Sequence, residues 1–302
     1  MAIEGLVAAV HSPFDRQTGE LNLAAVPAQL ELMLKQQVAG VFVCGSTGES
    51  HSLSLDERKQ LTEEWIRGAA GTALQVIVHV GGNCLRDSQQ LAAHAERSGA
   101  AAISAQAPSY YKPQNIQQLS EWCRAIMDSA AGTPFYYYDI PSMTGVSLSM
   151  PDFLEQAADT LPSLAGLKFT NPDLMSFQLC QRAAGGRFDI AFGVDEMLLA
   201  ALALGGSGAV GSTYNFAAPI YHAVTQAWLS GDLEAARMHQ FRSVQLIRLL
   251  ASYGYMSAAR QVMGFLNAPV GAPRQPHQDL SPERANQLRA DLEQLGFFDW
   301  VA

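Results

Sequence analysis

Short apolar runs alternate with longer segments of helical periodicity through most of the chain. Eight runs have the length and composition of buried strands, and they cover residues 5–10, 40–44, 75–80, 101–107, 134–140, 164–170, 189–194 and 207–211. Strands that alternate with helices pair in parallel through right-handed crossovers. Eight such units predict an α/β fold, specifically a (β/α)8 TIM barrel.

An open doubly wound sheet is the alternative architecture for this pattern. The first helical segment does not open with the GxGxxG motif typical of dinucleotide-binding sheets, which favours the barrel. Local signals also mark helix ends. Ser54 and Glu57 fit a capping box, while Gly99 and Gly132 stand where we expect helices to stop.

The last part of the chain has a different pattern. From about Asp232 onward the apolar spacing is helical, prolines interrupt it at positions 269, 273 and 276, and a last helix is expected over 281–295. We therefore expect a catalytic barrel over residues 1–230. A C-terminal helical extension over residues 231–302 would pack on it.

Composition and charge exclude several classes of function. The 302 residues are 48% hydrophobic and 16% charged, which is enough for a large core. The formal net charge of −9 argues against a nucleic-acid or anionic-membrane partner. No apolar run is long enough to predict a membrane span, and the N-terminus lacks the pattern of a signal peptide. Four widely spaced cysteines are typical of a reduced, cytoplasmic protein.

Lysine usage gives the sharpest chemical signal. Three of the four lysines have polar or loop surroundings, but Lys168 lies inside the apolar run 164–170. An unpaired charge in such a run is costly, and burial favours the neutral amine that acts as a Schiff-base nucleophile. Barrel active sites lie at the C-terminal strand ends, where Lys168 falls. The alternative is a strand-end lysine whose head reaches water or pairs with a carboxylate.

The run 134–140 carries three tyrosines near its end. Strand alternation puts Tyr136 and Tyr138 on the same side of the sheet. Tyr138 is nearer the C-terminal end, where it could relay a proton to or from a substrate hydroxyl. Aromatic packing with a satisfied hydroxyl is the alternative interpretation.

Two further polar clusters follow predicted strands. Ser46 and Thr47 stand between glycines directly after the second strand, in a GSTGE stretch suited to a carboxylate or phosphate, or simply to a polar turn. Asp195 and Glu196 end the seventh strand, where they suit a polyol or the N-terminus of the next helix. The glycine run 205–211 suits either a phosphate or a tightly packed last strand. The seven histidines form neither HxH nor HExxH, so we expect no metal and no organic cofactor.

Three of these segments together carry a family resemblance. The GSTGE stretch, the YDIP strand end at 138–141 and the GLK segment at 166–168 resemble the pyruvate-dependent class I lyases. This family includes N-acetylneuraminate lyases and dihydrodipicolinate synthases, and the likeness runs from Gly5 to about Pro273. The segments 192–196 and 211–215 are more similar to the sialic acid lyase branch. Met143 stands where the synthases carry an arginine for their second substrate, which argues against lysine biosynthesis.

The resemblance implies roles for individual residues. Lys168 would form the Schiff base with the keto carbon, and Tyr138 would shuttle the proton of the hydroxyl at the cleaved bond. Pyruvate-side binding would fall to Ser46, Thr47 and Thr170, and the N-acetylmannosamine part would be bound by Gly193, Asp195, Glu196 and Ser212. Tyr110 matches a tyrosine near or across a subunit contact in a family of homotetramers. Asp139 departs from the asparagine or histidine that the family places after its tyrosine.

The resemblance implies reversible cleavage of N-acetylneuraminate into pyruvate and N-acetylmannosamine. Three alternatives to this reaction remain at this point. The first is another pyruvate aldolase of the same barrel, acting on a 2-keto-3-deoxy sugar acid or a related keto acid. The second is a barrel that binds pyruvate or a sugar acid without catalysis. The third is an unrelated barrel enzyme that uses the glycine run to bind phosphate.

Overall fold

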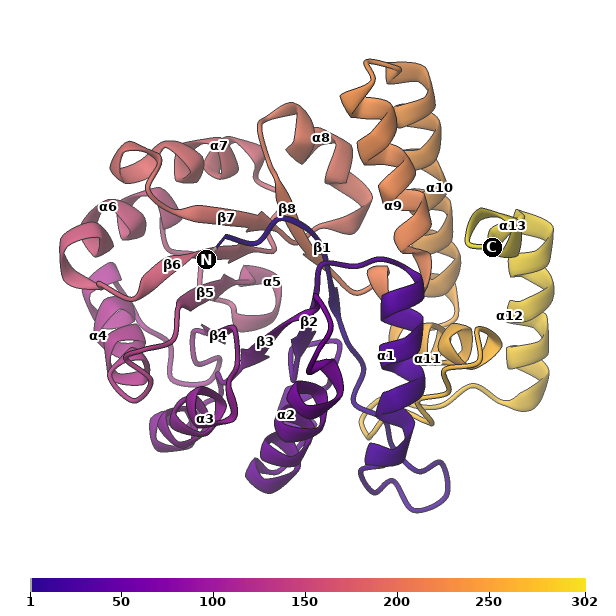
Figure 1. Cartoon of the computed structure of the whole chain (residues 1–302), viewed down its shortest axis with the longest axis horizontal. Helices are drawn as coiled ribbons and strands as arrows, with labels where there is room; N and C mark the ends of the chain where they lie inside the picture. Colours follow the sequence, from indigo (N-terminus) through magenta and orange to yellow (C-terminus); the bar gives the residue numbers. More distant parts are fainter. Residues whose placement is uncertain (1) are drawn as a thin grey trace.

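The fold is a closed barrel of eight parallel strands in chain order, seen in a computed structural model that describes residues 2–302 (Figure 1). The strands are β1 (Gly5–Ala9), β2 (Gly40–Val43), β3 (Gln75–His79), β4 (Ala102–Gln106), β5 (Phe135–Asp139), β6 (Leu164–Phe169), β7 (Asp189–Phe192) and β8 (Gly208–Gly211). β8 pairs with β1 and closes the ring. Each strand lies inside its predicted run, so the predicted (β/α)8 barrel is confirmed and the open sheet is excluded.

Both faces of the barrel sheet are buried. One set of alternating residues, including Phe42, Ile77, Tyr136 and Tyr138, fills the barrel interior. The other set joins the helices in a larger apolar cluster. Strands buried on both faces have continuous apolar sequences, which is why the runs stand out. The prediction that Tyr136 and Tyr138 share one face is confirmed.

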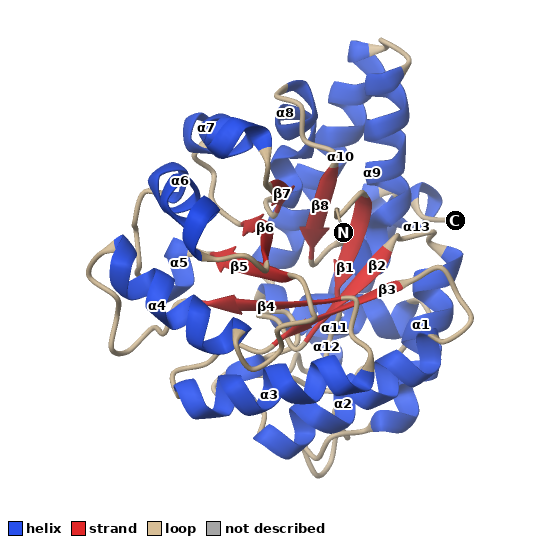
Figure 2. Cartoon of the chain, turned by 60° about the vertical axis from the view of Figure 1, so that its left-hand side comes forward, coloured by secondary structure: helices blue, strands red, loops and turns tan. Residues whose placement is uncertain are grey.

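Helices surround the barrel on its outside (Figure 2). They are α1 (Val26–Lys35), α2 (Leu55–Ala69), α3 (Leu85–Ser98), α4 (Ile116–Met127), α5 (Pro141–Thr144), α6 (Met150–Thr160), α7 (Leu174–Arg182), α8 (Leu198–Ala203) and α9 (Tyr214–Leu229). Short 3-10 turns include Ser50–Ser52 and Asp195–Met197. None of the helices in residues 2–302 is long and apolar enough to cross a membrane.

Most predicted helix ends are correct. The capping box at α2 is formed, with Ser54 N donating to Glu57 Oε2 at 2.8 Å, and Gly99 ends α3 in the left-handed conformation. The prediction for Gly132 is wrong, because α4 already ends at Met127 and a turn follows it. Gly132 instead donates its N–H to Glu96 Oε1 at 2.7 Å, which ties this turn to α3.

Helices follow the barrel in the described chain, as the spacing predicts, although it does not predict their number. They are α10 (Leu233–Ser252), α11 (Tyr255–Phe265), α12 (Pro282–Leu295) and α13 (Phe297–Trp300). Asp232 caps α10, and the three prolines lie in the irregular segment between α11 and α12. α10 packs along α9 at one side of the barrel, drawn in orange in Figure 1.

Candidate active site

Lys168 is buried inside the barrel near the C-terminal end of β6. The residue is only 4% exposed. Its Nζ atom lies 3.5 Å from the centroid of the Tyr138 ring and 4.7 Å from that of Phe42. No carboxylate in the described part of the chain lies within ion-pair distance of it. The amine therefore packs against two aromatic rings and has no carboxylate partner among the described residues.

Strand register places the key side chains in one layer. Tyr138 pairs with Lys168 across β5 and β6, and Gln106 pairs with Tyr138 across β4 and β5. The Tyr138 hydroxyl lies 3.2 Å from Ser46 Oγ, which comes from the loop after β2. The fold thus brings together a lysine, a tyrosine and a serine from three separate predicted motifs.

The GSTGE loop is strained at both ends. Cys44 and Glu49 have φ values of 59° and 53°, in the left-handed region that non-glycine residues rarely adopt. Such strain persists only where the surroundings enforce it, and it gathers at functional sites. Ser12 Oγ donates to the Gly48 carbonyl at 2.6 Å and helps to fix the loop. Thr47 in this loop is 8% exposed, whereas Ser46 is exposed at the mouth of the barrel.

A buried ion pair ties this loop to the C-terminal helices. Glu49 accepts from Arg260 Nη2, and their side chains are 2% and 0% exposed. Arg260 also donates to the carbonyls of Val270 and Ser12, at 2.7 and 2.8 Å. Arg274 adds its backbone N–H to Glu49 Oε2 at 2.9 Å. The sequence contains no local signal for this pair, since its partners are 211 residues apart.

Thr170 and Gly193 meet beside the lysine-bearing strand. Thr170 Oγ1 is buried and has no hydrogen-bond partner among the described residues. A Cβ atom at position 193 would overlap that hydroxyl, so only glycine fits there. An unsatisfied buried hydroxyl next to Lys168 is suited to a polar group of a ligand.

The predicted sugar-side residues lie at the ends of β7 and β8. Asp195 is buried and accepts from the N–H and the hydroxyl of Thr213, at 2.9 and 2.6 Å. Burial raises the pKa of Asp195 to about 6, against the effect of those hydrogen bonds. Ser212 Oγ lies 2.5 Å from the Tyr255 hydroxyl of α11. Glu196, by contrast, is exposed.

Two residues that the sequence singles out, Tyr110 and Asp139, do not lie near Lys168 of the same chain. Tyr110 is 77% exposed and packs edge-to-face on Tyr111 at the surface. Asp139 faces the helices on the outside of β5 and is 3% exposed. Among residues 2–302 its one side-chain hydrogen-bond partner is Asn171, whose Nδ2 donates to Oδ2 at 3.4 Å. Burial raises the pKa of Asp139 to about 7.

A cavity of about 170 Å³ opens beside Ser46, and we call it the side chamber. Its walls include Ser46, His51, His79, Gln106, Met143 and Thr144. Sequence reasoning missed the buried polar residues of this wall. A histidine and a glutamine inside the apolar runs 75–80 and 101–107 were the available signal.

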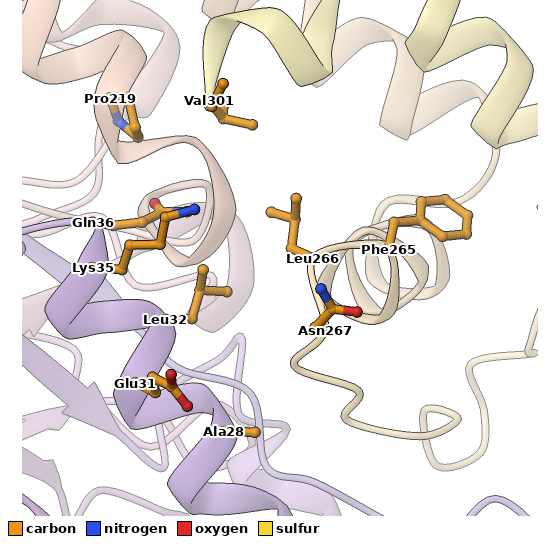
Figure 3. Close-up of a pocket in the computed structure, with 11 residues that line it drawn as sticks. Ala28, Glu31, Leu32, Lys35, Gln36, Pro219, Phe265, Leu266, Asn267 and Val301 are labelled. Carbon is orange, nitrogen blue, oxygen red and sulfur yellow. The ribbon is translucent and has the colours of Figure 1, made fainter.

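A larger cavity, of about 440 Å³, lies elsewhere. It is bounded by α1, the start of α9, the end of α11 and the last residues of the chain (Figure 3). No predicted site residue lines it. No group of three or more His, Cys, Asp or Glu side chains within residues 2–302 is arranged to hold a metal ion.

A parallel barrel with a buried lysine on β6 beside a tyrosine on β5 fits a class I aldolase, in which a lysine amine forms a Schiff base with the carbonyl substrate. The chain belongs to the dihydrodipicolinate synthetase family, whose model matches residues 2–295. The resemblance predicted from the sequence is thereby confirmed. With it, the chain is placed among the carbon–carbon lyases.

Individual relatives cover nearly the whole chain. N-acetylneuraminate lyase of Rattus norvegicus is 39% identical over 302 residues, which span 99% of this chain and 94% of the relative. The solved structure of Proteus mirabilis N-acetylneuraminate lyase has a TM-score of 0.95 at 37% identity, covering 98% of this chain and all of that one. Dihydrodipicolinate synthase from Aquifex aeolicus has a TM-score of 0.88 at 27% identity, over 97% and 98% of the two chains.

Proposed function

We propose that this enzyme reversibly cleaves N-acetylneuraminate into pyruvate and N-acetylmannosamine. The observation that carries the proposal is the Lys168 amine, buried without a carboxylate partner and packed on the Tyr138 ring. Relatives of 36–40% identity over most of the chain are named N-acetylneuraminate lyase, which supports this substrate.

The first half of the reaction uses Lys168. Its neutral amine attacks the C2 keto carbon of the open-chain substrate, and water leaves to form an iminium ion. The iminium accepts the electron pair of the C3–C4 bond when that bond breaks. The C4 hydroxyl gives its proton to Tyr138, and N-acetylmannosamine departs as an aldehyde. Ser46, 3.2 Å from the tyrosine hydroxyl, can pass that proton onward.

The second half restores the enzyme. The enamine left on Lys168 takes up at C3 the proton that Tyr138 received, which restores the tyrosine, and becomes an iminium again. Water adds to C2, and pyruvate is released with the free amine. Through both halves the substrate carboxylate is bound by the Ser46–Thr47 backbone and hydroxyls, and by the unpartnered hydroxyl of Thr170.

We assign the sugar part to the ends of β7 and β8, at Gly193, Asp195, Glu196 and Ser212. We further propose a cytoplasmic homotetramer in which Tyr110 lies near or across a subunit contact. Support for an interface comes from the exposed aromatic pair Tyr110 and Tyr111, which are 77% and 84% exposed. The division into a barrel over 1–230 and an extension over 231–302 is part of the same proposal.

A second candidate is an aldolase of this family that acts on a 2-keto-3-deoxy sugar acid. The structural likeness to a dihydrodipicolinate synthase keeps this candidate open, because a fold shared with an enzyme of another name does not by itself fix the substrate. The aldehyde product separates the two candidates. Met143, which stands where the synthases carry an arginine, is exposed and offers no positive charge for the carboxylate of a second substrate. This residue therefore argues against a dihydrodipicolinate synthase.

Pyruvate release from N-acetylneuraminate, coupled to lactate dehydrogenase, tests the proposal. We expect release by the wild-type protein and none by Lys168→Ala. Borohydride reduction in the presence of pyruvate should add a stable mass to Lys168, and Lys59→Ala is the matched lysine control. A reduced adduct on another lysine would overturn the assignment of Lys168. An adduct on Lys168 without release from N-acetylneuraminate would favour the second candidate.

A further inference from the structure

Arg58 of α2 is a buried cation without an acid partner. The residue is 6% exposed, and no Asp or Glu within residues 2–302 lies at ion-pair distance from its guanidinium. It donates instead to two backbone carbonyls at the end of β3, Gly81 O at 2.9 Å and His79 O at 2.7 Å. Its Nε atom has no hydrogen-bond partner among the described residues. A charge buried in this way is costly unless another charge compensates it.

Two other arginines near the GSTGE loop already have their acids. Arg260 pairs with Glu49, and Arg274 pairs with Glu57. Burial lowers the pKa of Arg58, but a guanidinium stays protonated in proteins. The positive charge of Arg58 is therefore left uncompensated behind the loop.

One histidine ring connects Arg58 to the start of the loop. Arg58 Nη2 lies 3.4 Å from His79 Nδ1, and the same Nδ1 lies 2.8 Å from the Cys44 carbonyl oxygen. The guanidinium is thus separated from that oxygen by at most the sum of the two distances, about 6.2 Å. The His79 ring also packs edge-to-face on Tyr138, with ring centroids 5.8 Å apart. Arg58 therefore lies behind both the loop and the catalytic tyrosine.

The proposed position of the substrate carboxylate is close to this end of the loop. Ser46 and Thr47, its proposed ligands, follow Cys44 by two and three residues. The carboxylate carbon is bonded to C2, which joins the Lys168 amine that packs on the Tyr138 ring. Since consecutive Cα atoms are about 3.8 Å apart, we expect the carboxylate to lie on the order of 10–12 Å from the guanidinium.

We propose that Arg58 is the buried counter-charge of the substrate carboxylate, and that it makes the enzyme select 2-oxo acids over neutral 2-oxo compounds. The inference rests on the proposed function, in which Lys168 binds C2 and the GSTGE loop binds the carboxylate. Arg58 does not touch the substrate but acts through the electric field of its charge. Such a local cation is needed because the chain as a whole, with a formal net charge of −9, repels an anion.

The size of the effect follows from the distance between the two charges. At roughly 10–12 Å and an effective dielectric constant of about 20, two unit charges change a binding constant by roughly 10–15-fold. A neutral compound of the same shape lacks this contribution. Pyruvamide is such a compound, because an amide replaces the carboxylate while the keto group that Lys168 attacks is kept.

The test compares pyruvate with pyruvamide on variants of Arg58. Each compound is incubated with the enzyme, the iminium on Lys168 is reduced by borohydride, and the concentration for half-maximal trapping is measured from the adduct mass. The ratio of the two concentrations gives the preference for the anion. Arg58→Gln keeps an N–H donor but loses the charge, and it should lower the preference by about tenfold. Arg58→Lys keeps the charge and should stay within about twofold of the wild type.

Arg124→Gln on α4 is the matched control. Arg124 is an exposed arginine that also donates to a backbone carbonyl, Thr160 O at 3.1 Å. Its replacement changes the net charge by the same amount and should leave the preference for pyruvate unchanged. If pyruvamide is trapped by none of the proteins, the half-maximal concentration for pyruvate alone is compared. That concentration should rise about tenfold in Arg58→Gln and not in Arg58→Lys.

Trapping of pyruvate by the wild type separates the possible failures. If the wild type traps no pyruvate, the proposed function fails and the inference fails with it. If pyruvate is trapped but Arg58→Gln keeps the wild-type preference, the counter-charge is overturned and the proposed function stands. An equal loss in Arg58→Gln and Arg58→Lys also overturns it, because Arg58 would then only join α2 to β3. Should Arg58→Gln not fold, Arg58→Lys decides alone, since a retained preference supports the counter-charge and a lost one overturns it.

Discussion

At the scale of single residues, the site depends on a tyrosine with two separable parts. The ring of Tyr138 packs against the Lys168 amine at 3.5 Å, and its hydroxyl lies 3.2 Å from Ser46 Oγ. The ring therefore positions the nucleophile, whereas the hydroxyl moves the proton. The two parts can be tested separately because phenylalanine keeps one and removes the other.

Tyr138→Phe should reduce turnover by about 10²–10⁴-fold, the usual contribution of a positioned acid–base group. Trapping of pyruvate by borohydride should persist, since the ring still faces Lys168. Steady-state rates and adduct mass measure the two effects. Tyr136→Phe is the control on the same face of β5, where the hydroxyl donates to Asp189 at 2.8 Å, and it should leave turnover nearly unchanged. Unchanged turnover in Tyr138→Phe would show that Tyr138 only packs against its neighbours and does not transfer the proton.

At the scale of elements, β5 and β6 bring the lysine and the tyrosine together, and their outer side contains a buried acid. Asp139 accepts one long hydrogen bond from Asn171, which follows β6. Its backbone carbonyl also accepts from Thr170 N at 2.8 Å. These hydrogen bonds from Asn171 and Thr170 to Asp139 join the C-terminal ends of β5 and β6. A carboxyl in this position makes the link sensitive to pH.

Asp139→Asn should remove a pH-dependent loss of stability. Burial raises the pKa of Asp139 from 3.8 to about 7, so the folded state keeps a proton that the unfolded state loses near pH 4. The contribution of this group to the free energy of unfolding therefore falls as pH rises from about 4 to 7. The thermal midpoint of Asp139→Asn should exceed that of the wild type by more at pH 8 than at pH 5. A difference independent of pH would contradict the buried, titrating carboxyl.

At the scale of the whole molecule, the pattern of apolar residues explains which features of the fold and the site could be predicted from the sequence. Strands buried on both faces leave continuous apolar runs, so the barrel and the positions of Lys168 and Tyr138 could be predicted. Contacts between distant segments leave no such trace. The Glu49–Arg260 pair joins residues far apart in the chain, and the buried Gln106 lies beside Tyr138 only because β4 and β5 pair in this register. These features depend on tertiary geometry, which local patterns do not encode.

The same pair makes the C-terminal helices a support of the active-site loop. Arg260→Met should lower the free energy of unfolding by about 3–5 kcal/mol, because Glu49 is left charged and buried without its partner. It should also raise KM, since the strained GSTGE loop loses its anchor. Urea unfolding and steady-state kinetics measure the two effects.

A double variant and a surface pair make this prediction specific. Arg260→Met combined with Glu49→Leu should recover much of the lost stability, because no buried charge remains. It should not recover KM, because the loop still lacks its link to α11. Arg289→Met breaks an exposed pair with Glu293 and should change the free energy of unfolding by less than about 1 kcal/mol. If Arg260→Met behaves like Arg289→Met, the extension does not anchor the loop, and the barrel alone enforces the strain at Cys44 and Glu49.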